Sequence, residues 1–261
     1  MSAVGGDALQ ARGLNVRLSD ARIVDHAAVA LRAGEVVALV GPNGAGKTTL
    51  MRALAGLIPA DGEIVLQGRA LASMSARERA RAIAYLPQGH MFHWPLPVAA
   101  VVALGRHPHG DPFSPPTPAD NAAIDRALTA TGTKALAARA VTSLSGGERA
   151  RVALARALAT EAAVLLADEP TMSLDPRHQL VVMDLLRRAA DRGGAVFAVM
   201  HDLTLAARFF DRVVVMYGGR IVVDAGPAQA LSPARVAEVF GVETINVKVG
   251  GGTVTIPWRP L

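Results

Sequence analysis

Residues 41–48 have the residue types and spacing that binding a chain of phosphates requires. They read G-x-x-x-x-G-K-T and follow an apolar stretch, residues 36–40, typical of a strand buried on both faces. Glycines let backbone N–H groups approach phosphate oxygens, Lys47 adds a positive charge, and the Thr48 hydroxyl is a hard oxygen ligand for Mg²⁺. We predict a nucleotide phosphate site at the start of a helix, rather than a glycine-rich turn without a ligand. The loop residues are Gly41, Pro42, Asn43, Gly44, Ala45, Gly46, Lys47, Thr48 and Thr49.

Two acidic residues, Asp168 and Glu169, follow a second apolar stretch that begins at Val164. A buried strand would bring Asp168 beside the phosphate loop, where it would hold Mg²⁺ directly or through water. Glu169 would lie one residue further, at the carboxyl edge of the strand, where it would polarise an attacking water. The alternative is that the acidic pair only solvates the end of a strand. We favour the metal and water roles because the same chain contains the phosphate loop.

A third stretch, residues 144–148, reads Leu-Ser-Gly-Gly-Glu. Ser145 and Glu148 have the spacing of a capping box at the start of a helix. A simple cap has no use for Gly146 and Gly147, because each glycine costs up to ~1 kcal/mol of helix propensity. Bare N–H groups at a helix N-terminus suit a second anion that approaches closely. The chain is therefore predicted to have two phosphate-facing surfaces.

Composition narrows the class of protein. The 261 residues include no cysteine, which excludes disulfides and thiolate metal sites. We expect neither a spanning helix nor a signal peptide, because no apolar segment reaches 18 residues and the N-terminus has no cationic region before an apolar one. The net charge of +5 is spread out and the aromatic content is 4%, so we expect no nucleic-acid partner. Four histidines lack fixed ligand spacing and predict no metal site: His90, His93, His107 and His109.

The elements that must position these residues follow an α/β pattern with a mainly helical insertion. Prolines late in residues 90–118 argue against regular structure there. We predict strands at residues 13–19, 22–31, 36–40, 63–67, 83–86, 164–167, 195–200, 213–217, 220–224, 244–248 and 253–256. We predict helices at residues 46–54, 75–82, 121–131, 134–140, 176–191, 203–210 and 233–240, and a further one that starts at Ser145.

In this order and spacing, the motifs resemble those of the ATP-binding subunit of an ABC transporter: Walker A at 41–48, signature at 144–148 and Walker B at 164–169. The resemblance covers nearly the whole chain. It adds a Q-loop glutamine at Gln88, a switch histidine at His201, and a D-loop of Ser173, Leu174 and Asp175. The chain also departs from the family, which usually has an aromatic residue near position 18, where this chain has Leu18. Arg17 or Arg22 could stack on the base instead. Met172 replaces a serine that is common in the D-loop.

The fold that this resemblance implies is an α/β P-loop NTPase of the ABC type, formed by residues 1–261 as a single ATPase domain. Its RecA-like core, with an N-terminal antiparallel β subdomain, is expected in residues 1–88 and 159–240. An inserted α-helical signature subdomain is expected in residues 89–158, and a C-terminal β-hairpin tail in residues 241–261.

The resemblance also implies roles for residues. ATP and Mg²⁺ are the expected ligands, and a head-to-tail homodimer is expected in the ATP-bound state. Glu169 is expected to activate water, His201 to contact the γ-phosphate, and Gln88 to link the metal to a membrane partner. The implied metal ligands are Thr48, Gln88 and Asp168. The residues expected to reach nucleotide across the dimer are Ser145, Gly146, Gly147, Glu148 and Asp175.

Two stretches, residues 101–109 and 201–211, resemble those of importers of iron–siderophore, haem and cobalamin. In such systems the ATPase docks on an integral membrane permease at the cytoplasmic face of the inner membrane. A periplasmic or extracellular binding protein supplies the substrate. The alternatives are an importer of another substrate and a non-transport ABC ATPase that acts in DNA repair or translation. A regulatory GTPase is disfavoured because the chain has no N-K-x-D motif.

Overall fold

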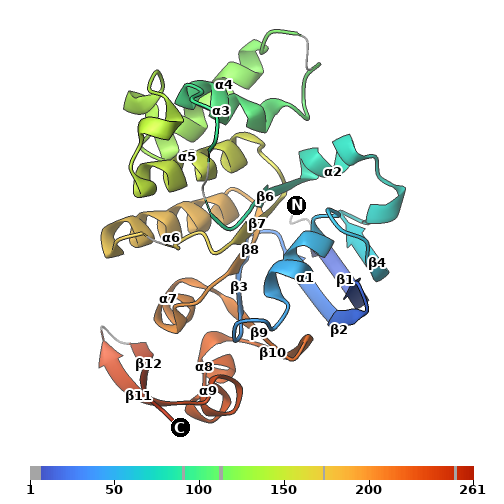
Figure 1. The fold of residues 1–261 in the computed structure, drawn as a ribbon, viewed down its shortest axis with the longest axis vertical. Helices are drawn as coiled ribbons and strands as arrows, with labels where there is room; N and C mark the ends of the chain where they lie inside the picture. Colours follow the sequence, from blue (N-terminus) through green and yellow to red (C-terminus); the bar gives the residue numbers. More distant parts are fainter. Residues whose placement is uncertain (1–6, 90–91, 112–113, 173, 250–251) are drawn as a thin grey trace, which may run out of the picture.

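A parallel β-sheet runs through the middle of the molecule (Figure 1). The computed structural model describes residues 7–89, 92–111, 114–172, 174–249 and 252–261. Within them, the central sheet has six strands in the order β10-β9-β3-β8-β7-β6. They are β3 (Val36–Val40), β6 (Ile83–Leu86), β7 (Val164–Asp168), β8 (Ala195–Val199), β9 (Arg212–Tyr217) and β10 (Arg220–Ala225). Only β10 runs antiparallel to its neighbour. These strands confirm the predicted ones to within a residue or two.

The central strands β3, β7 and β8 are apolar and fully buried because both faces of the sheet are covered. Alternate residues of β3 point to opposite sides: Ala38 belongs to one apolar cluster, and Val37 and Leu39 to the other. Helices α5, α6 and α7 cover the first side, and α1 and a second sheet cover the other. These helices are α1 (Lys47–Leu54), α5 (Gly146–Ala159), α6 (Pro176–Asp191) and α7 (Leu203–Phe209).

The second sheet is antiparallel, in the order β2-β1-β4-β5, and lies beside α1 (Figure 1). Its strands are β1 (Asp7–Leu18), β2 (Ala21–Arg32), β4 (Asp61–Leu66) and β5 (Arg69–Ala70). The predicted antiparallel pair is confirmed, although β1 begins six residues earlier than expected. Arg212 of β9 joins the two sheets, because its Nε lies 2.8 Å from Glu35 Oε1 and its guanidinium donates to the Ala30 carbonyl.

The described part of residues 89–158 is mainly helical. Helices α3 (Val98–Ala103) and α4 (Pro118–Ala130) pack against α5 around an apolar core that includes Val101, Leu128 and Val152. Short 3-10 turns complete this helical cluster at Leu104–Arg106, Lys134–Leu136 and Val141–Ser143.

Two predicted helix boundaries in this cluster are wrong. The helix predicted at residues 134–140 is only a 3-10 turn, because the carbonyls of Ala137 and Arg139 accept hydrogen bonds from the first N–H groups of α3. Helix α4 begins at Pro118, three residues before the predicted start. Thr117 and Asp120 form a capping box there, and proline is well suited to the first position of a helix.

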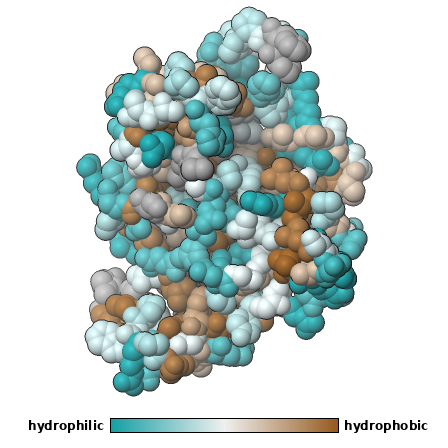
Figure 2. Space-filling model, in the orientation of Figure 1, coloured by the Kyte–Doolittle hydropathy of each residue, from teal (hydrophilic) through white to brown (hydrophobic). Residues whose placement is uncertain are grey.

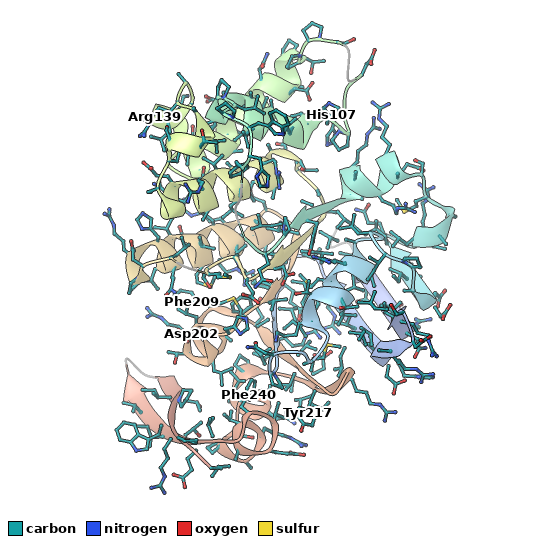
Figure 3. The ribbon with its side chains drawn as sticks, in the orientation of Figure 1. His107, Arg139, Asp202, Phe209, Tyr217 and Phe240 are labelled. Carbon is teal, nitrogen blue, oxygen red and sulfur yellow. The ribbon has the colours of Figure 1, made fainter. Side chains whose placement is uncertain are left out.

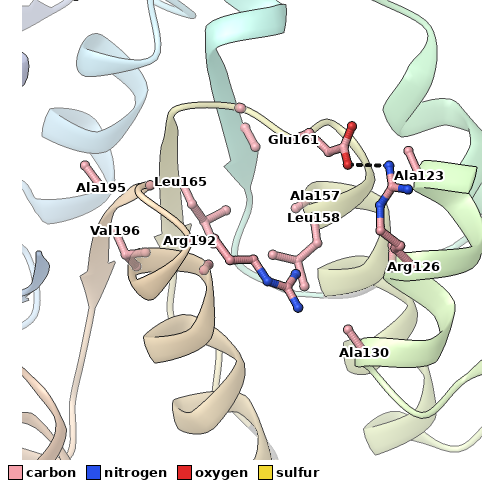
Figure 4. Close-up of a pocket in the computed structure, with 15 residues that line it drawn as sticks. Ala123, Arg126, Ala130, Ala157, Leu158, Glu161, Leu165, Arg192, Ala195 and Val196 are labelled. Atoms are coloured by element: carbon pink, nitrogen blue, oxygen red, sulfur yellow. Dashed lines mark hydrogen bonds and ion pairs between the residues drawn. The ribbon is translucent and has the colours of Figure 1, made fainter. Parts of the chain in front are cut away.

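Charged side chains join α4 and the Leu104–Arg106 turn to the end of α5, which leads into β7 (Figure 4). Arg126 of α4 lies 2.8 Å from Glu161, which also lies 3.2 Å from Arg106. Arg106 pairs with Asp120 at 2.8 Å and donates to the Ala159 carbonyl at 2.9 Å. The Arg106 and Asp120 side chains are only 11% and 8% exposed, so this pair is the buried member of the network.

The remaining elements lie at the periphery. They are α2 (Ala76–Ala82), a 3-10 turn at Leu71–Ser73, α8 (Pro227–Ala230), α9 (Pro233–Phe240), β11 (Val242–Val249) and β12 (Gly252–Pro260). Strands β11 and β12 confirm the predicted terminal hairpin, which packs against α7 and α9. Two residues of its glycine turn, Gly250 and Gly251, lie outside the described residues, as does His90.

None of the described helices is both long and apolar enough to cross a membrane. Figure 2 shows hydrophilic residues spread over one face of the molecule, with a hydrophobic strip to the right of its centre.

Asp120→Asn is expected to destabilise the fold by about 2 kcal/mol at neutral pH, because it removes the buried charged partner of Arg106 and leaves only the more exposed Glu161. Hydrogen bonds from Thr117 and from Arg106 lower the pKa of Asp120 from 3.8 to about 2. A lowered carboxyl pKa stabilises the fold above pH 3.8, and this contribution disappears as the pH falls toward 2. Urea unfolding at several pH values should therefore show that the free energy of unfolding differs between the variant and wild type, and that this difference shrinks below pH 4.

The matched control is Asp125→Asn, on the same helix, whose exposed carboxylate pairs with Lys134. It should cost well under about 1 kcal/mol, since exposed ion pairs contribute little. An equal loss in both variants would contradict the assignment of the buried pair.

Candidate active site

The phosphate loop connects β3 to α1, and the lysine of the loop donates hydrogen bonds to loop carbonyls. Lys47 is only 6% exposed, and its Nζ donates to the carbonyls of Gly41 at 2.7 Å and Pro42 at 2.9 Å. Gly46, at the helix N-cap, has φ of 98°, and a Cβ there would lie 2.7 Å from the Ile23 carbonyl oxygen. Only glycine fits this position without strain. The loop thus places the N-terminus of a helix and a buried cation together, as an anion site requires.

A buried carboxylate lies beside this loop. Asp168, at the end of β7, is fully buried and accepts hydrogen bonds at 3.3 Å from the Thr48 hydroxyl and at 3.3 Å from the Tyr85 hydroxyl. Burial raises the pKa of Asp168, and the hydrogen bond from Thr48 opposes this increase. Burial likewise lowers the pKa of Lys47, which the negative charges of Glu169 and Asp168 oppose. Both charged groups are therefore desolvated.

The oxygens of Thr48 and Asp168 fit Mg²⁺, which prefers hard oxygen ligands and is commonly bound by one or two carboxylates plus substrate phosphates. A divalent cation at this place would also compensate the charge of a carboxylate that burial otherwise disfavours.

Two further predicted residues, His201 and Gln88, meet at the predicted Glu169. Its Oε1 lies 2.6 Å from His201 Nε2, and its Oε2 accepts from the Gln88 amide at 2.9 Å. Glu169 itself has φ of 52°, an uncommon conformation for a residue with a side chain. Both carboxylate oxygens therefore have partners, and these partners fix the direction in which the side chain points.

Strand order explains why residues so far apart in sequence meet here. β8 lies between β3 and β7, and all three are parallel, so their carboxyl ends share one edge of the sheet. The phosphate loop follows β3, Glu169 follows β7, and His201 follows β8 just before α7, whose N-terminus Asp202 caps (Figure 3). Together they line a cleft of about 640 Å³, a volume ordinary for small-molecule sites. The residues lining it are Leu18, Ile23, Asn43, Gly44, Ala45, Gly46, Lys47, Thr48, Thr49, Gln88, Glu169, Met172 and His201.

The predicted second phosphate-facing surface, with Gly146 and Gly147, is not part of this cleft. Ser145 caps α5 and forms the predicted capping box: Glu148 N donates to Ser145 Oγ at 3.2 Å, and Ser145 N donates to Glu148 Oε2 at 2.8 Å. Gly146 and Gly147 occupy the first turn, and a Cβ at Gly147 would lie 3.7 Å from His178 Nδ1. The start of α5 therefore lies beside the start of α6.

Asp175 caps α6, accepting from the His178 N–H at 2.9 Å and lying 2.7 Å from the His178 ring. These hydrogen bonds lower the pKa of Asp175. The structure thus places the signature residues and Asp175 near each other and outside the cleft, while Ser173 lies outside the described residues.

Three residues in or beside the cleft were not predicted to contribute: Ile23, which lines it, Tyr85 and Met172. Tyr85 points from β6 to Asp168; the only sequence signal is a hydroxyl-bearing residue inside a short apolar strand. Met172 lines the cleft with its sulfur 3.6 Å from the Gln88 amide. Arg17 and Arg22, the alternatives for stacking on a base, are absent from the lining, whereas Leu18 belongs to it.

The chain is similar to known proteins over most of its length. The ABC transporter family is matched over residues 24–172. A cobalamin import ATP-binding protein of Halobacterium salinarum is 44% identical over 255 residues, which are 97% of this chain and 64% of that protein. The chain thus spans just under two thirds of that relative's length.

A hemin import ATP-binding protein of Streptomyces coelicolor is 43% identical over 263 residues, covering 98% of this chain and 92% of that protein. The fold is shared with an ABC transporter assigned to the metal-chelate type, solved in an inward-facing conformation. Its TM-score is 0.84 at 24% identity, over 97% of this chain and 98% of that one. The chain therefore belongs to the ABC transporter family.

Proposed function

We propose that this protein is the subunit of an ABC importer that binds and hydrolyses ATP. The observation that carries the proposal is the meeting of the phosphate loop, the buried Asp168 and the Gln88–Glu169–His201 cluster at one edge of the sheet. A phosphate-binding loop alone would suit a protein that only binds nucleotide. The carboxylate of Glu169, in the same cleft as the loop, suits hydrolysis of the terminal phosphate.

In this proposal the triphosphate lies along residues 41–49, with Lys47 near the β- and γ-phosphates. Thr48 and Asp168 hold Mg²⁺, and Gln88 completes its protein ligands. The metal, when bound, neutralises charge on the phosphate oxygens.

Hydrolysis then needs an oriented water. Glu169 accepts a proton from the water while the water oxygen attacks the γ-phosphorus. The bond between that phosphorus and the β–γ bridging oxygen then breaks, and ADP and inorganic phosphate are released. His201, 2.6 Å from Glu169, orients the carboxylate and contacts the γ-phosphate. Gln88 contacts the same carboxylate and connects it to the chain segment that follows.

A second copy of the chain completes the site. The cleft is open, and the N–H groups and glycines at the start of α5 lie outside it, so one chain has two half-sites. In a two-fold dimer, the start of α5 in one subunit closes the cleft of the other, so that one interface makes two ATP sites. The residues that would reach across are Ser145, Gly146, Gly147, Glu148 and Asp175.

The transported cargo follows the relatives, which are named for import of cobalamin and of hemin. We propose cargo of this class, with iron–siderophore complexes included, and an integral membrane permease as direct partner. The subunit would lie peripherally at the cytoplasmic face of the inner membrane, and a substrate-binding protein would act indirectly. The segment after Gln88 is the proposed docking face, where Trp94 is 76% exposed and Leu96 is 41% exposed.

Glu169→Gln is expected to keep ATP binding and to lower the hydrolysis rate by about 10²-fold or more, because an amide cannot take the proton from water. Phosphate release and ATP titration measure the two effects separately. Glu63→Gln, at an exposed glutamate on β4 that pairs with Arg12, is the control and should retain full activity. Continued hydrolysis by Glu169→Gln would refute the role given to Glu169.

Ser145→Arg should leave ATP binding to the single chain intact and prevent ATP-dependent dimer formation, since a long cation replaces a small residue at the start of α5. Light scattering coupled to gel filtration measures the dimer fraction, with Ser145→Arg and its control each made in the Glu169→Gln background. Ser73→Arg, on an exposed 3-10 turn, is the matched control and should dimerise normally. Unchanged dimerisation of Ser145→Arg would count against the shared site.

A further inference from the structure

A methionine sulfur lies beside the glutamine that contacts Glu169. Met172 lines the cleft, and its Sδ is 3.6 Å from the Gln88 amide nitrogen, which donates to Glu169 at 2.9 Å. We propose that Met172 is a site of reversible oxidation, at which a peroxide converts the thioether to a sulfoxide and thereby slows ATP hydrolysis. The effect on hydrolysis rests on the proposed function, whereas the oxidation itself does not.

The turn after β7 fixes where this sulfur lies. The Met172 N–H donates to the Glu169 carbonyl at 3.1 Å, and the Leu174 N–H donates to the Thr171 carbonyl at 3.2 Å. The backbone thus connects Met172 directly to Glu169. Their side chains also share a partner, because both contact the Gln88 amide. A chemical change at the sulfur therefore acts on a group that Glu169 already uses.

Met172 is the accessible methionine among the residues that the structure describes. It is 46% exposed, whereas the other five described methionines are at most 8% exposed. The chain has no cysteine, so no thiolate competes for an oxidant. A peroxide in solution meets an exposed sulfur before a buried one, so Met172 is the expected first target. The buried methionines are Met51, Met74, Met183, Met200 and Met216.

The oxidation is a two-electron step with hydrogen peroxide as the oxidant. The sulfur lone pair attacks one peroxide oxygen, a sulfur–oxygen bond forms and the oxygen–oxygen bond breaks. The departing oxygen takes up the proton of the transferred oxygen and leaves as water. Sulfur is oxidised and peroxide is reduced, and methionine sulfoxide reductases reverse the change.

The added oxygen changes the hydrogen bonding of Gln88. A carboxamide NH₂ group has two hydrogens to donate, and a thioether is only a weak acceptor. One hydrogen bond goes to Glu169 in this structure, and the other contact is the weak one to Met172. The sulfoxide is polar, and its oxygen gives the second hydrogen a strong acceptor. Gln88 is then held by two hydrogen bonds of ordinary strength in place of one.

Gln88 has two roles in the proposed function, since it contacts the carboxylate that activates water and supplies an oxygen to Mg²⁺. Holding its amide between Glu169 and the oxidised Met172 opposes any movement of that oxygen toward the metal. We expect ATP hydrolysis to become about fivefold slower, which is the factor that one hydrogen bond of ordinary net strength provides.

The test is limited oxidation of the full chain with hydrogen peroxide, followed by peptide mass spectrometry and by measurement of phosphate release. Met172 should gain one oxygen atom before any buried methionine does. The hydrolysis rate should fall about fivefold, while ATP binding is retained. Treatment with both methionine sulfoxide reductases should restore the rate, which irreversible damage to the fold would not allow.

Met172→Leu should hydrolyse ATP at the same rate before and after peroxide treatment, because leucine has no sulfur to oxidise. The matched control is Met91→Leu, since Met91 also follows Gln88 closely in sequence. This control should remain as sensitive to peroxide as wild type.

Oxidation of a buried methionine ahead of Met172 overturns the inference. So does an unchanged or faster rate in protein oxidised at Met172, or a slower rate in peroxide-treated Met172→Leu. If untreated wild type hydrolyses no ATP, the proposed function fails together with the effect on hydrolysis. The peptide map then still decides whether Met172 is the oxidation site.

Discussion

The nucleotide cleft is organised around two buried charges, the carboxylate of Asp168 and the ammonium of Lys47. Asp168 is fully enclosed at the end of β7, and Lys47 is nearly enclosed at the start of α1. Neither forms an ion pair with the other among the described contacts; Asp168 accepts from two hydroxyls, and Lys47 donates to two carbonyls. Two desolvated charges held apart are costly to the fold, and a polyanion together with a divalent cation would compensate both.

The sheet makes this arrangement possible. Because β3, β8 and β7 are parallel neighbours, everything that follows them emerges at one edge. Burial on both faces makes the strands rigid, and short connections then place Glu169 and His201 within hydrogen-bond distance. The site is therefore built on segments that directly follow the strands: the phosphate loop after β3, Glu169 after β7, His201 after β8 and Gln88 after β6.

The helical cluster is connected to this core through α5, which packs against the sheet and also against α3 and α4. A network in which Arg106 contacts Asp120, Glu161 and the Ala159 carbonyl holds α4 to the end of that helix. α5 carries Ser145 at one end and this network at the other. In the proposed dimer, the orientation of α5 decides how the signature residues face the partner subunit.

The sequence by itself determined the chemistry and the local elements. Glycine spacing, the cap of Ser145 and Glu148, and the apolar strands before Gly41 and Asp168 all depend on residues close in sequence, and such patterns are readable without a structure. The tertiary structure decided what pairs over long distances. Gln88 and His201 meet on Glu169, the carbonyls of residues 137 and 139 cap α3 instead of continuing a helix, and Arg22 turns to Asp25 rather than to the cleft. Each of these depends on which backbone or charged group a remote segment offers, and strand order and packing decide that, not local sequence.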